Sequence, residues 1–163
     1  MVMTTIRVGR VSDATGIALL SAQLGYEVAV SDAEQRLSRI LTRPDQQFLV
    51  ADRDKEVVGW AHAVVIDYVD AEPWVRIAGL VVHREHRRMG IGRALLARAE
   101  AWAAEQGCSY VRLSSASTRT AAHRFYESVG YTNIKTQLSF IKSVDGSGDA
   151  RFRAFVPRVD ESE

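Results

Sequence analysis

The sequence predicts an α/β fold in a single domain, a mixed and mostly antiparallel sheet flanked by helices. Between residues 47 and 82, apolar segments with strand-like alternation follow one another closely, which favours antiparallel pairing. Residues 73–117 then have the order strand, helix, strand, and such a unit joins two parallel strands through a right-handed crossover. The length of 163 residues, of which 47% are hydrophobic, suits one compact domain.

The first half of the chain predicts a strand, two helices and a hairpin. The three predicted strands cover residues 4–11, 47–51 and 57–66, the last two joined by a turn at 52–56. Ser12 or Asp13 can cap the first helix, and the second begins at the capping-box pattern of residues 31–34. Apolar residues at helical spacing mark both helices: Ile17, Leu20, Leu24, Leu37, Ile40 and Leu41.

The second half predicts three more strands and two more helices. The strands cover residues 73–82, 108–117 and 136–144. Gly107 ends a helix over 93–106, and Gly130 closes a shorter helix over 118–130. One side of the longer helix is apolar through Leu95, Leu96, Ala99, Trp102 and Ala103. Glycine-rich residues 145–149 break the pattern before a last apolar segment.

Composition argues against several classes of function. Lys and Arg number 21 against 20 Asp and Glu, so we expect no nucleic-acid partner. The single cysteine, Cys108, cannot form an internal disulfide, and the first residues lack an apolar core of signal-peptide length, so we expect a cytoplasmic protein. No apolar run is long enough to span a membrane, and no His/Cys cluster has metal-ligand spacing, so we expect neither a membrane partner nor a metal.

A cationic loop with two glycines joins the strand over 73–82 to the helix that follows. Between a strand end and a helix start, such a loop can direct successive backbone N–H groups into one concavity, where the helix dipole adds positive charge. Gly90 and Gly92 allow the backbone to approach an anion closely. Three positive side chains accompany them: Arg87, Arg88 and Arg93. We therefore expect a bound phosphate or pyrophosphate.

The common phosphate motifs do not fit this loop. No Gly-Lys-Ser/Thr follows, as a Walker loop requires, and Leu95 stands where the dinucleotide fingerprint needs glycine. The segment LVVHREHRRMGIGRALL instead resembles the Arg/Gln-x-x-Gly-x-Gly/Ala motif of the GCN5-related N-acetyltransferase (GNAT) family, with Arg87, Gly90 and Gly92 in the motif positions. The later segment AAHRFYESVGY resembles that family's Ala-x-x-x-Phe/Leu-Tyr-x-x-x-Gly-Phe/Tyr segment.

The resemblance covers roughly residues 5–142 and implies an N-acetyltransferase domain over 1–144, with a tail over 145–163. Such an enzyme moves the acetyl group of acetyl-CoA to a primary amine of a small molecule or peptide, by direct attack in a ternary complex. In this family the strand before the glycine loop carries a β-bulge and splays from its parallel neighbour, which admits acetyl-CoA. Here the bulge is expected near Gly79, which lacks a Cβ.

The resemblance also implies which residues hold acetyl-CoA. Backbone groups after the bulge would bind the pantetheine arm and the thioester carbonyl, and the glycine loop would bind the pyrophosphate. On the later helix, Arg119 stands where many relatives have Asn, and His123 lies one turn before the family's tyrosine. The implied cofactor residues are Leu80, Val81, Val82, Arg87, Arg88, Met89, Gly90, Ile91, Gly92, Arg93, Arg119 and His123.

Tyr126, at the position of the family's tyrosine, is the predicted proton donor to the leaving thiolate; the alternative is a purely structural aromatic side chain. Some relatives place a Glu base on the strand before the loop, but the comparable residue here is Arg76, which cannot act as a base. Glu72 is the predicted base, in a loop just before that strand, and Asp70 and His62 are the alternatives.

The first helices and the loop over 67–74, with its acidic and aromatic residues, are expected to bind the acceptor and to favour a cationic amine. The tail after residue 144 is expected to pair with the sheet edge of a second copy, giving a homodimer. Two other functions stay open. One is a non-catalytic acyl-CoA-binding regulatory module, and the other is a small nucleotide-binding α/β protein.

Overall fold

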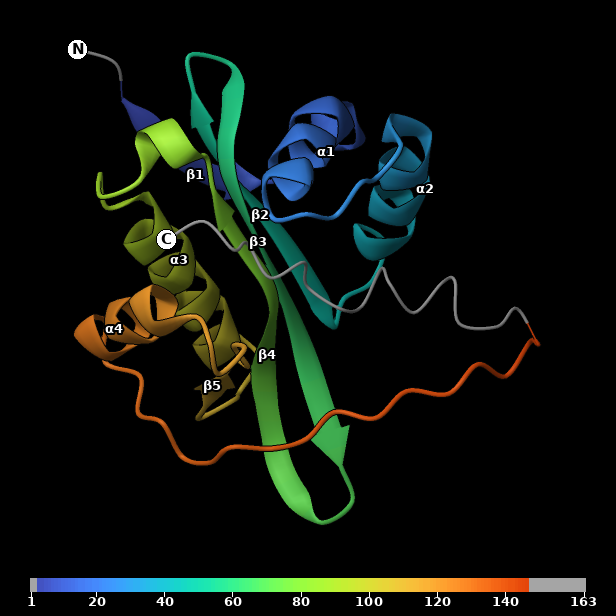
Figure 1. Cartoon of the computed structure of the whole chain (residues 1–163), viewed down its shortest axis with the longest axis vertical. Coiled ribbons are helices and arrows are strands. Elements are labelled where there is room, and N and C mark those ends of the chain that lie inside the picture. Colours follow the sequence, from blue (N-terminus) through green and yellow to red (C-terminus); the bar gives the residue numbers. More distant parts are fainter. Residues whose placement is uncertain (1–2, 147–163) are drawn as a thin grey trace. The chain divides into compact units, whose positions relative to one another are not determined.

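The computed structural model describes residues 3–146, and the chain divides after Ser114 into two compact units. The first unit contains the mixed sheet that the sequence predicts, with strand order β1-β2-β3-β4-β5 among the described residues (Figure 1). All neighbours pair antiparallel except β4 and β5, which are parallel. The strands are β1 Thr4–Val8, β2 Gln46–Arg53, β3 Glu56–Tyr68, β4 Ala71–Val82 and β5 Val111–Arg112.

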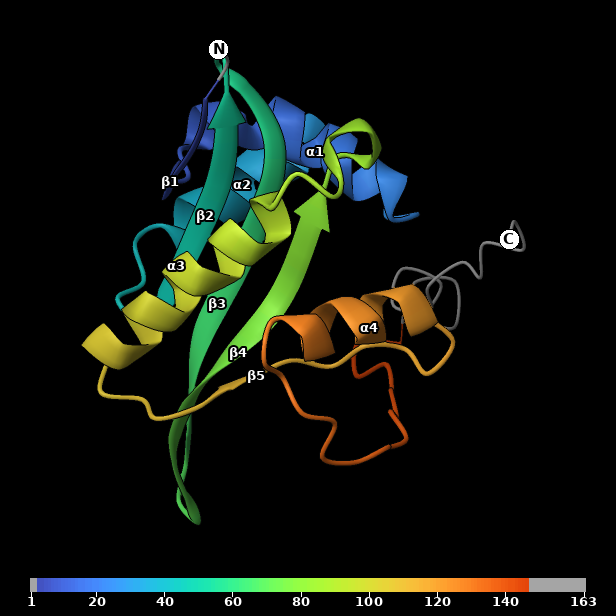
Figure 2. The same ribbon diagram turned by 90° about the vertical axis from the view of Figure 1, so that its left-hand side faces the viewer.

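Three α-helices flank this sheet, and a fourth belongs to the second unit. Helices α1 and α2 cover one face of the sheet, and α3 covers the other (Figure 2). The helices are α1 Ala14–Gln23, α2 Val30–Ile40, α3 Ile91–Glu105 and α4 Thr120–Ser128, with short 3-10 helices η1 Val11–Asp13 and η2 Arg84–His86. Within residues 3–146, no helix combines the length and apolar character needed to cross a bilayer.

Each face of the sheet has its own buried core. Between the sheet and helices α1 and α2 lies one hydrophobic cluster. In it, Phe48 and Val50 of β2 pack with Ile17 of α1 and Leu37 of α2. On the other face, α3 buries the apolar side predicted from its periodicity: Leu95, Leu96, Ala99, Trp102 and Ala103. Gly107 follows this helix with a φ of 75°, as predicted for its C-terminal end.

The capping box predicted for the second helix is wrong, whereas Asp13 is the N-cap of α1 as predicted but makes no side-chain cap bond. Helix α2 begins at Val30 with Ala29 as its N-cap, so Ser31 lies inside the helix and makes no capping box. Asp13 does precede α1, but its carboxylate makes no cap bond to that helix. It accepts hydrogen bonds from the Arg7 guanidinium at 2.8 and 2.9 Å and from the Arg10 N–H at 2.7 Å instead. A buried ion pair thus replaces the local cap.

Three other predicted segments differ from the structure. The strand expected over 108–117 shrinks to Val111–Arg112. Residues 136–144 form no strand, and Leu138 and Phe140 are exposed, so alternation alone was not sufficient for a strand. The loop expected over 67–74 is the tip of the β3–β4 hairpin, with only two residues between the strands. Pro73 is tolerated there because the register shifts between Ile66 and Tyr68.

Candidate active site

A β-bulge interrupts β4 where the sequence predicts one. His62 of β3 pairs with Gly79, but the next residue, Ala63, pairs with Ile77, so Ala78 is the extra residue of β4. A Cβ atom at position 79 would lie 2.5 Å from Cζ3 and 2.6 Å from Cη2 of Trp60. Glycine is therefore required at this position because the indole of the neighbouring strand lies across it.

Beyond this bulge, one edge of β4 is open. Strand β5 pairs only with Val75 and Arg76, so among the described residues the rest of β4 has β3 as its only strand partner. The His83 N–H donates to Val58 of β3 at 2.8 Å, whereas the Val82 carbonyl accepts from Arg87 Nε at 3.4 Å. Because β4 and β5 pair over only two residues, their parallel pairing ends at Arg76. This is the splayed pair of parallel strands that the predicted fold includes.

Backbone groups alternate in direction along a strand, so those of Leu80 and Val82 face the open edge. By the same alternation, the backbone of Val81 faces β3, and its side chain is buried. The predicted cofactor residues Leu80 and Val82 can therefore offer backbone hydrogen bonds at the edge. Val81 supports the strand from inside.

The loop after β4 forms a concavity at the start of α3. Arg88 and Gly90 have left-handed φ values of 62° and 79°, a backbone that turns successive N–H groups toward one side. Gly90 is the N-cap of α3, and its carbonyl accepts from Ala94 N–H at 3.0 Å. The first three helical N–H groups, those of Ile91, Gly92 and Arg93, have no acceptor within the helix. Free N–H groups at the start of a helix can bind an anion.

Side chains around this concavity are mostly exposed and positive. Arg87, Arg88, Met89 and Arg93 are exposed, and within residues 3–146 no carboxylate lies within ion-pair distance of the three arginines. Ile91 differs because its side chain is buried in the core, so only its N–H group is available to a ligand. The loop therefore presents backbone N–H groups together with exposed guanidinium groups, of which that of Arg87 also donates to the Val82 carbonyl.

The second unit carries the other three predicted site residues on or beside α4. Arg119 is the N-cap of this helix and is exposed. His123 Nε2 donates to the Ala116 carbonyl at 2.9 Å, so this nitrogen already has a partner. Tyr126 packs edge-on against Tyr131, with ring centroids 6.1 Å apart. Burial raises the pKa of Tyr126, although the Arg119 charge opposes the shift, so the phenol stays protonated at neutral pH.

Glu72, the predicted base, lies in β4 rather than in a preceding loop. It is exposed near the hairpin tip, as is Asp70 in the turn. Trp74, near this tip, has two side-chain neighbours. Its ring packs edge-on against Tyr68 at 6.4 Å between centroids, and the Arg112 guanidinium lies 4.3 Å above it.

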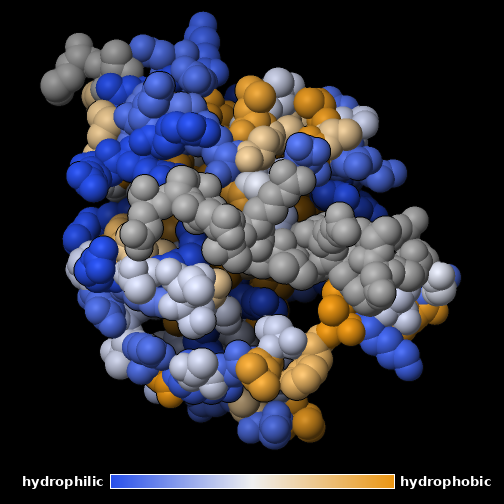
Figure 3. Space-filling model, in the orientation of Figure 1, coloured by the Kyte–Doolittle hydropathy of each residue, from blue (hydrophilic) through white to orange (hydrophobic). Residues whose placement is uncertain are grey.

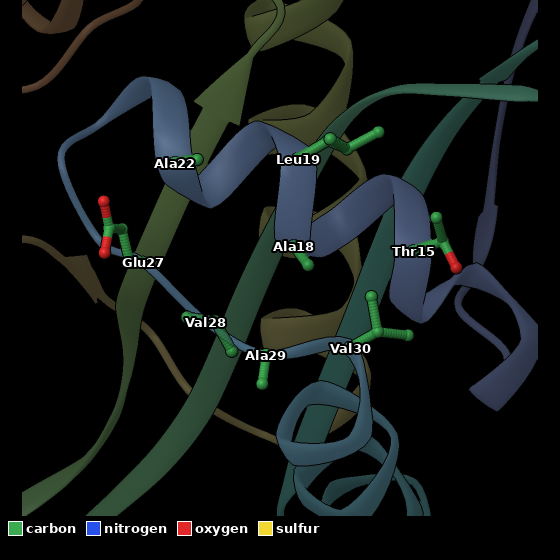
Figure 4. Close-up of a pocket in the computed structure, with 8 residues that line it drawn as sticks. All are labelled: Thr15, Ala18, Leu19, Ala22, Glu27, Val28, Ala29 and Val30. Atoms are coloured by element: carbon green, nitrogen blue, oxygen red, sulfur yellow. The ribbon is translucent and has the colours of Figure 1, made fainter.

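An apolar groove lies between α1 and the connection to α2. Figure 4 shows its two walls, one formed by α1 and the other by the chain entering α2. Leu19 and Val30 are exposed apolar residues of this groove. The space-filling view shows hydrophobic surface over α1 (Figure 3). The lining residues are Thr15, Ala18, Leu19, Ala22, Glu27, Val28, Ala29 and Val30. At the end of α1, Gln23 Oε1 accepts from the Arg84 N–H at 3.1 Å, which places this end against the loop after β4.

Comparison with known proteins adds three findings. A family model described as the acetyltransferase (GNAT) family matches residues 18–131. Human N-acetyltransferase 8 is 35% identical over 94 residues, which are 57% of this chain and 40% of that protein. The aminoglycoside N(6')-acetyltransferase type 1 of Stenotrophomonas maltophilia is 29% identical over 141 residues, which are 83% of this chain and 91% of that protein.

The solved structure of aminoglycoside N-acetyltransferase AAC(6')-Iy in complex with CoA has the same fold, with a TM-score of 0.79. The alignment covers 87% of this chain and 96% of that one at 20% sequence identity, so this likeness concerns the fold alone. The chain spans less than half the length of the human relative but most of the bacterial one.

Proposed function

Because this chain belongs to the acetyltransferase (GNAT) family, we propose that it moves the acetyl group of acetyl-CoA to a primary amine of a small molecule or peptide, by direct attack in a ternary complex. The observation that carries the proposal is the continuity of two features. The open edge of β4 at Leu80 and Val82 leads directly into the anion-binding loop before α3. A ligand with an amide-bearing arm and a pyrophosphate matches both.

The residues present fit acetyl-CoA along this path. The edge groups of Leu80 and Val82 pair with the amides of the pantetheine arm, as an added strand would. The N–H groups of Ile91, Gly92 and Arg93 and the exposed guanidinium groups bind the pyrophosphate. Next to the bulge, the Leu80 N–H is free to stabilise the negative charge that develops on the thioester oxygen.

Tyr126 supplies the proton that the departing thiolate needs. A phenol with a raised pKa holds its single acidic proton across the neutral range, so it can donate that proton when the thiolate forms. The amine loses two protons overall as the C–N bond forms and the C–S bond breaks. One of them replaces the proton that Tyr126 gives to sulfur, and the other leaves to solvent.

We propose a cationic amine as the acceptor. Two bacterial relatives are named aminoglycoside N(6')-acetyltransferases, which supports a polyamine-like or aminosugar acceptor. The groove beside α1 has an acidic residue, Glu27, at its rim, and the hairpin tip adds Asp67, Asp70 and Glu72. Carboxylates in these places would attract an ammonium group toward the face of the sheet that α1 and α2 cover.

The test is an acetyl-CoA-dependent thiol-release screen with aminoglycosides, polyamines and lysine peptides, run beside a calorimetric measurement of CoA binding. We expect CoA binding and turnover with at least one amine. CoA binding without turnover on any amine would favour the regulatory module instead. Absence of CoA binding would contradict the site itself.

We also propose that the tail assembles a homodimer, although residues 147–163 lie outside the described part of the chain. Truncation after Val144 removes the apolar residues Phe152 and Phe155 from the proposed contact. We expect light scattering to show a dimer for the full chain and a monomer after truncation. An unchanged mass would exclude the tail from this role.

A further inference from the structure

His62 occupies the position in β3 directly opposite the bulge of β4. Its cross-strand partner is Gly79, and the extra bulge residue beside Gly79 is Ala78. Both are small, and on this face Gly79 is covered by the indole of Trp60, which lies two residues before His62 on the same strand. Neighbouring strands lie about 5 Å apart, so the imidazole is one strand spacing from that edge.

The imidazole is held in one orientation by β2. His62 Nε2 lies 2.9 Å from Gln46 Oε1, and the ring packs against Phe48 with centroids 5.6 Å apart. With the amide oxygen as acceptor, Nε2 carries the proton and Nδ1 keeps its lone pair. In the neutral ring this hydrogen bond leaves Nδ1 as the nitrogen that can accept a proton.

His62 lies on the face of the sheet that α1 and α2 cover, because it pairs with Phe48 of their common core. This is also the face on which the α1 groove opens. Under the proposed function, the thioester lies at the edge beside Leu80, and the amine arrives from the helical side. His62 then lies on the side of the sheet from which the amine arrives, opposite the bulge.

We propose that His62 is the general base of the acetyl transfer, a role that rests on the proposed N-acetyltransferase function. As the amine nitrogen attacks the thioester carbon, the new C–N bond makes its remaining protons more acidic. Nδ1 accepts one of them, giving a transient imidazolium that later releases this proton to solvent. The C–S bond then breaks, the thiolate takes its proton from Tyr126, and the resulting phenolate takes a proton back from solvent.

Burial lowers the pKa of His62, and no neighbouring charge contributes to the shift. The surroundings agree with this. On β2 and β3 its neighbours on the same face are uncharged, and α1 contains no charged residue. The charged residues of α2 are exposed, while Ala33 and Leu37 face the core. On β4 the nearest charged residue of this face is Arg76, opposite Val64. A neutral imidazole at pH 7 is thus ready to accept a proton.

The alternative base, Glu72, is far from the bulge. It precedes Gly79 by a stretch of extended strand that spans roughly 20 Å at about 3.3 Å per residue. A carboxylate at that distance cannot reach a proton on an amine beside Leu80, even through one water molecule. Between the two residues, position therefore favours His62.

The decisive experiment compares pH profiles of kcat at saturating acetyl-CoA for the wild-type chain and for His62→Gln, with an amine that the screen identifies. Glutamine keeps a hydrogen-bonding side chain beside Gln46 but cannot accept the proton. We expect kcat to fall by about 100-fold, within the range for general bases. We also expect the acidic limb of the wild-type profile, which lies below the ordinary histidine pKa, to disappear. The Kd of acetyl-CoA should not change.

Three further variants separate the outcomes. His83→Gln, an equal change in another histidine, should keep the acidic limb. His62→Ala should recover part of its rate when imidazole is added, which a structural role would not allow. Glu72→Gln tests the competing carboxylate. Loss of the acidic limb in Glu72→Gln would overturn the proposal while leaving the acetyltransferase function intact. A His62→Gln variant that keeps both the acidic limb and the wild-type kcat would do the same. A wild-type chain that turns over no amine would overturn both.

Discussion

Burial moves the pKa values of Tyr126 and His62 in directions that suit opposite tasks. It raises the pKa of the phenol and lowers that of the imidazole, because in each case the charged form is the one that loses hydration. At neutral pH the tyrosine keeps a proton to give and the histidine keeps a lone pair to receive one. The two assignments of acid and base in the proposed reaction follow from this difference.

At Tyr126, replacement by phenylalanine keeps the ring and its packing against Tyr131 but removes the proton. We expect kcat to fall by about 10- to 1000-fold, with little change in acetyl-CoA affinity or Tm. Because the pKa is raised above the ordinary tyrosine value of 10.0, the wild-type activity should show no decline from loss of the Tyr126 proton between pH 6 and 9. Steady-state rates from pH 6 to 9 test this. Tyr110→Phe, which changes an exposed tyrosine, is the control, and equal rates for the two variants would make Tyr126 structural.

At Gly90, the left-handed φ of 79° and the open space around its missing Cβ allow a sharp test of the anion site. Gly90→Val should weaken acetyl-CoA binding at least tenfold, about 1.4 kcal/mol, because the side chain enters the space that the pyrophosphate needs. Gly107 is the matched control, since it has a φ of 75°, equally open surroundings and a place at the other end of α3. Gly107→Val should cost similar stability and leave the Kd unchanged. Calorimetry that shows equal Kd values for both would remove Gly90 from the site.

At the scale of elements, β4 combines two roles in one strand. Its first half completes a hairpin and pairs with β5, and its second half has a free edge. The bulge at Ala78 and Gly79 divides the two halves and changes which backbone groups face outward. The open edge therefore depends on the packing of Trp60 over Gly79.

A methyl group at position 79 tests that dependence. Gly79→Ala places Cβ against the Trp60 indole, so the ring or the strand must shift, and we expect a loss of about 1–3 kcal/mol in unfolding free energy together with reduced turnover. Adding Trp60→Leu should restore part of the stability lost, because the clash is relieved. Denaturant unfolding of the two single variants and the double variant measures this coupling. Additive losses would show that the two side chains do not interact.

At the scale of the whole molecule, the charges nearly cancel, with a net charge of +1. Attraction of CoA must therefore come from the local cluster of Arg87, Arg88 and Arg93 rather than from the overall field. Exposed charges of this kind are screened by salt.

We therefore expect acetyl-CoA to bind more tightly than an acetylated pantetheine fragment without phosphates, by a margin that shrinks as salt rises. Titrations at low and high ionic strength measure the two Kd values. Equal affinities at low salt would show that the loop does not bind the pyrophosphate.

The sequence by itself determines the features that depend on neighbours along the chain. The buried side of α3, the glycine at its end and the β2–β3 hairpin follow from periodicity and turn residues, because these act within a few positions. The anion-binding loop is of the same kind, since the backbone of Arg88 and Gly90 turns within a short segment. The family motif added the bulge near Gly79, which local pattern alone would not have placed.

Only the tertiary structure decided which strands meet and in what register. Pairing made Glu72 part of β4 despite its low strand propensity, whereas the alternating residues 136–144 formed no strand. The same register brought His62 opposite Gly79, a relation between residues on separate strands that no local pattern encodes. Register depends on long-range packing of the two sheet faces, so the sequence could name His62 as one base among several, and the fold alone set it beside the bulge.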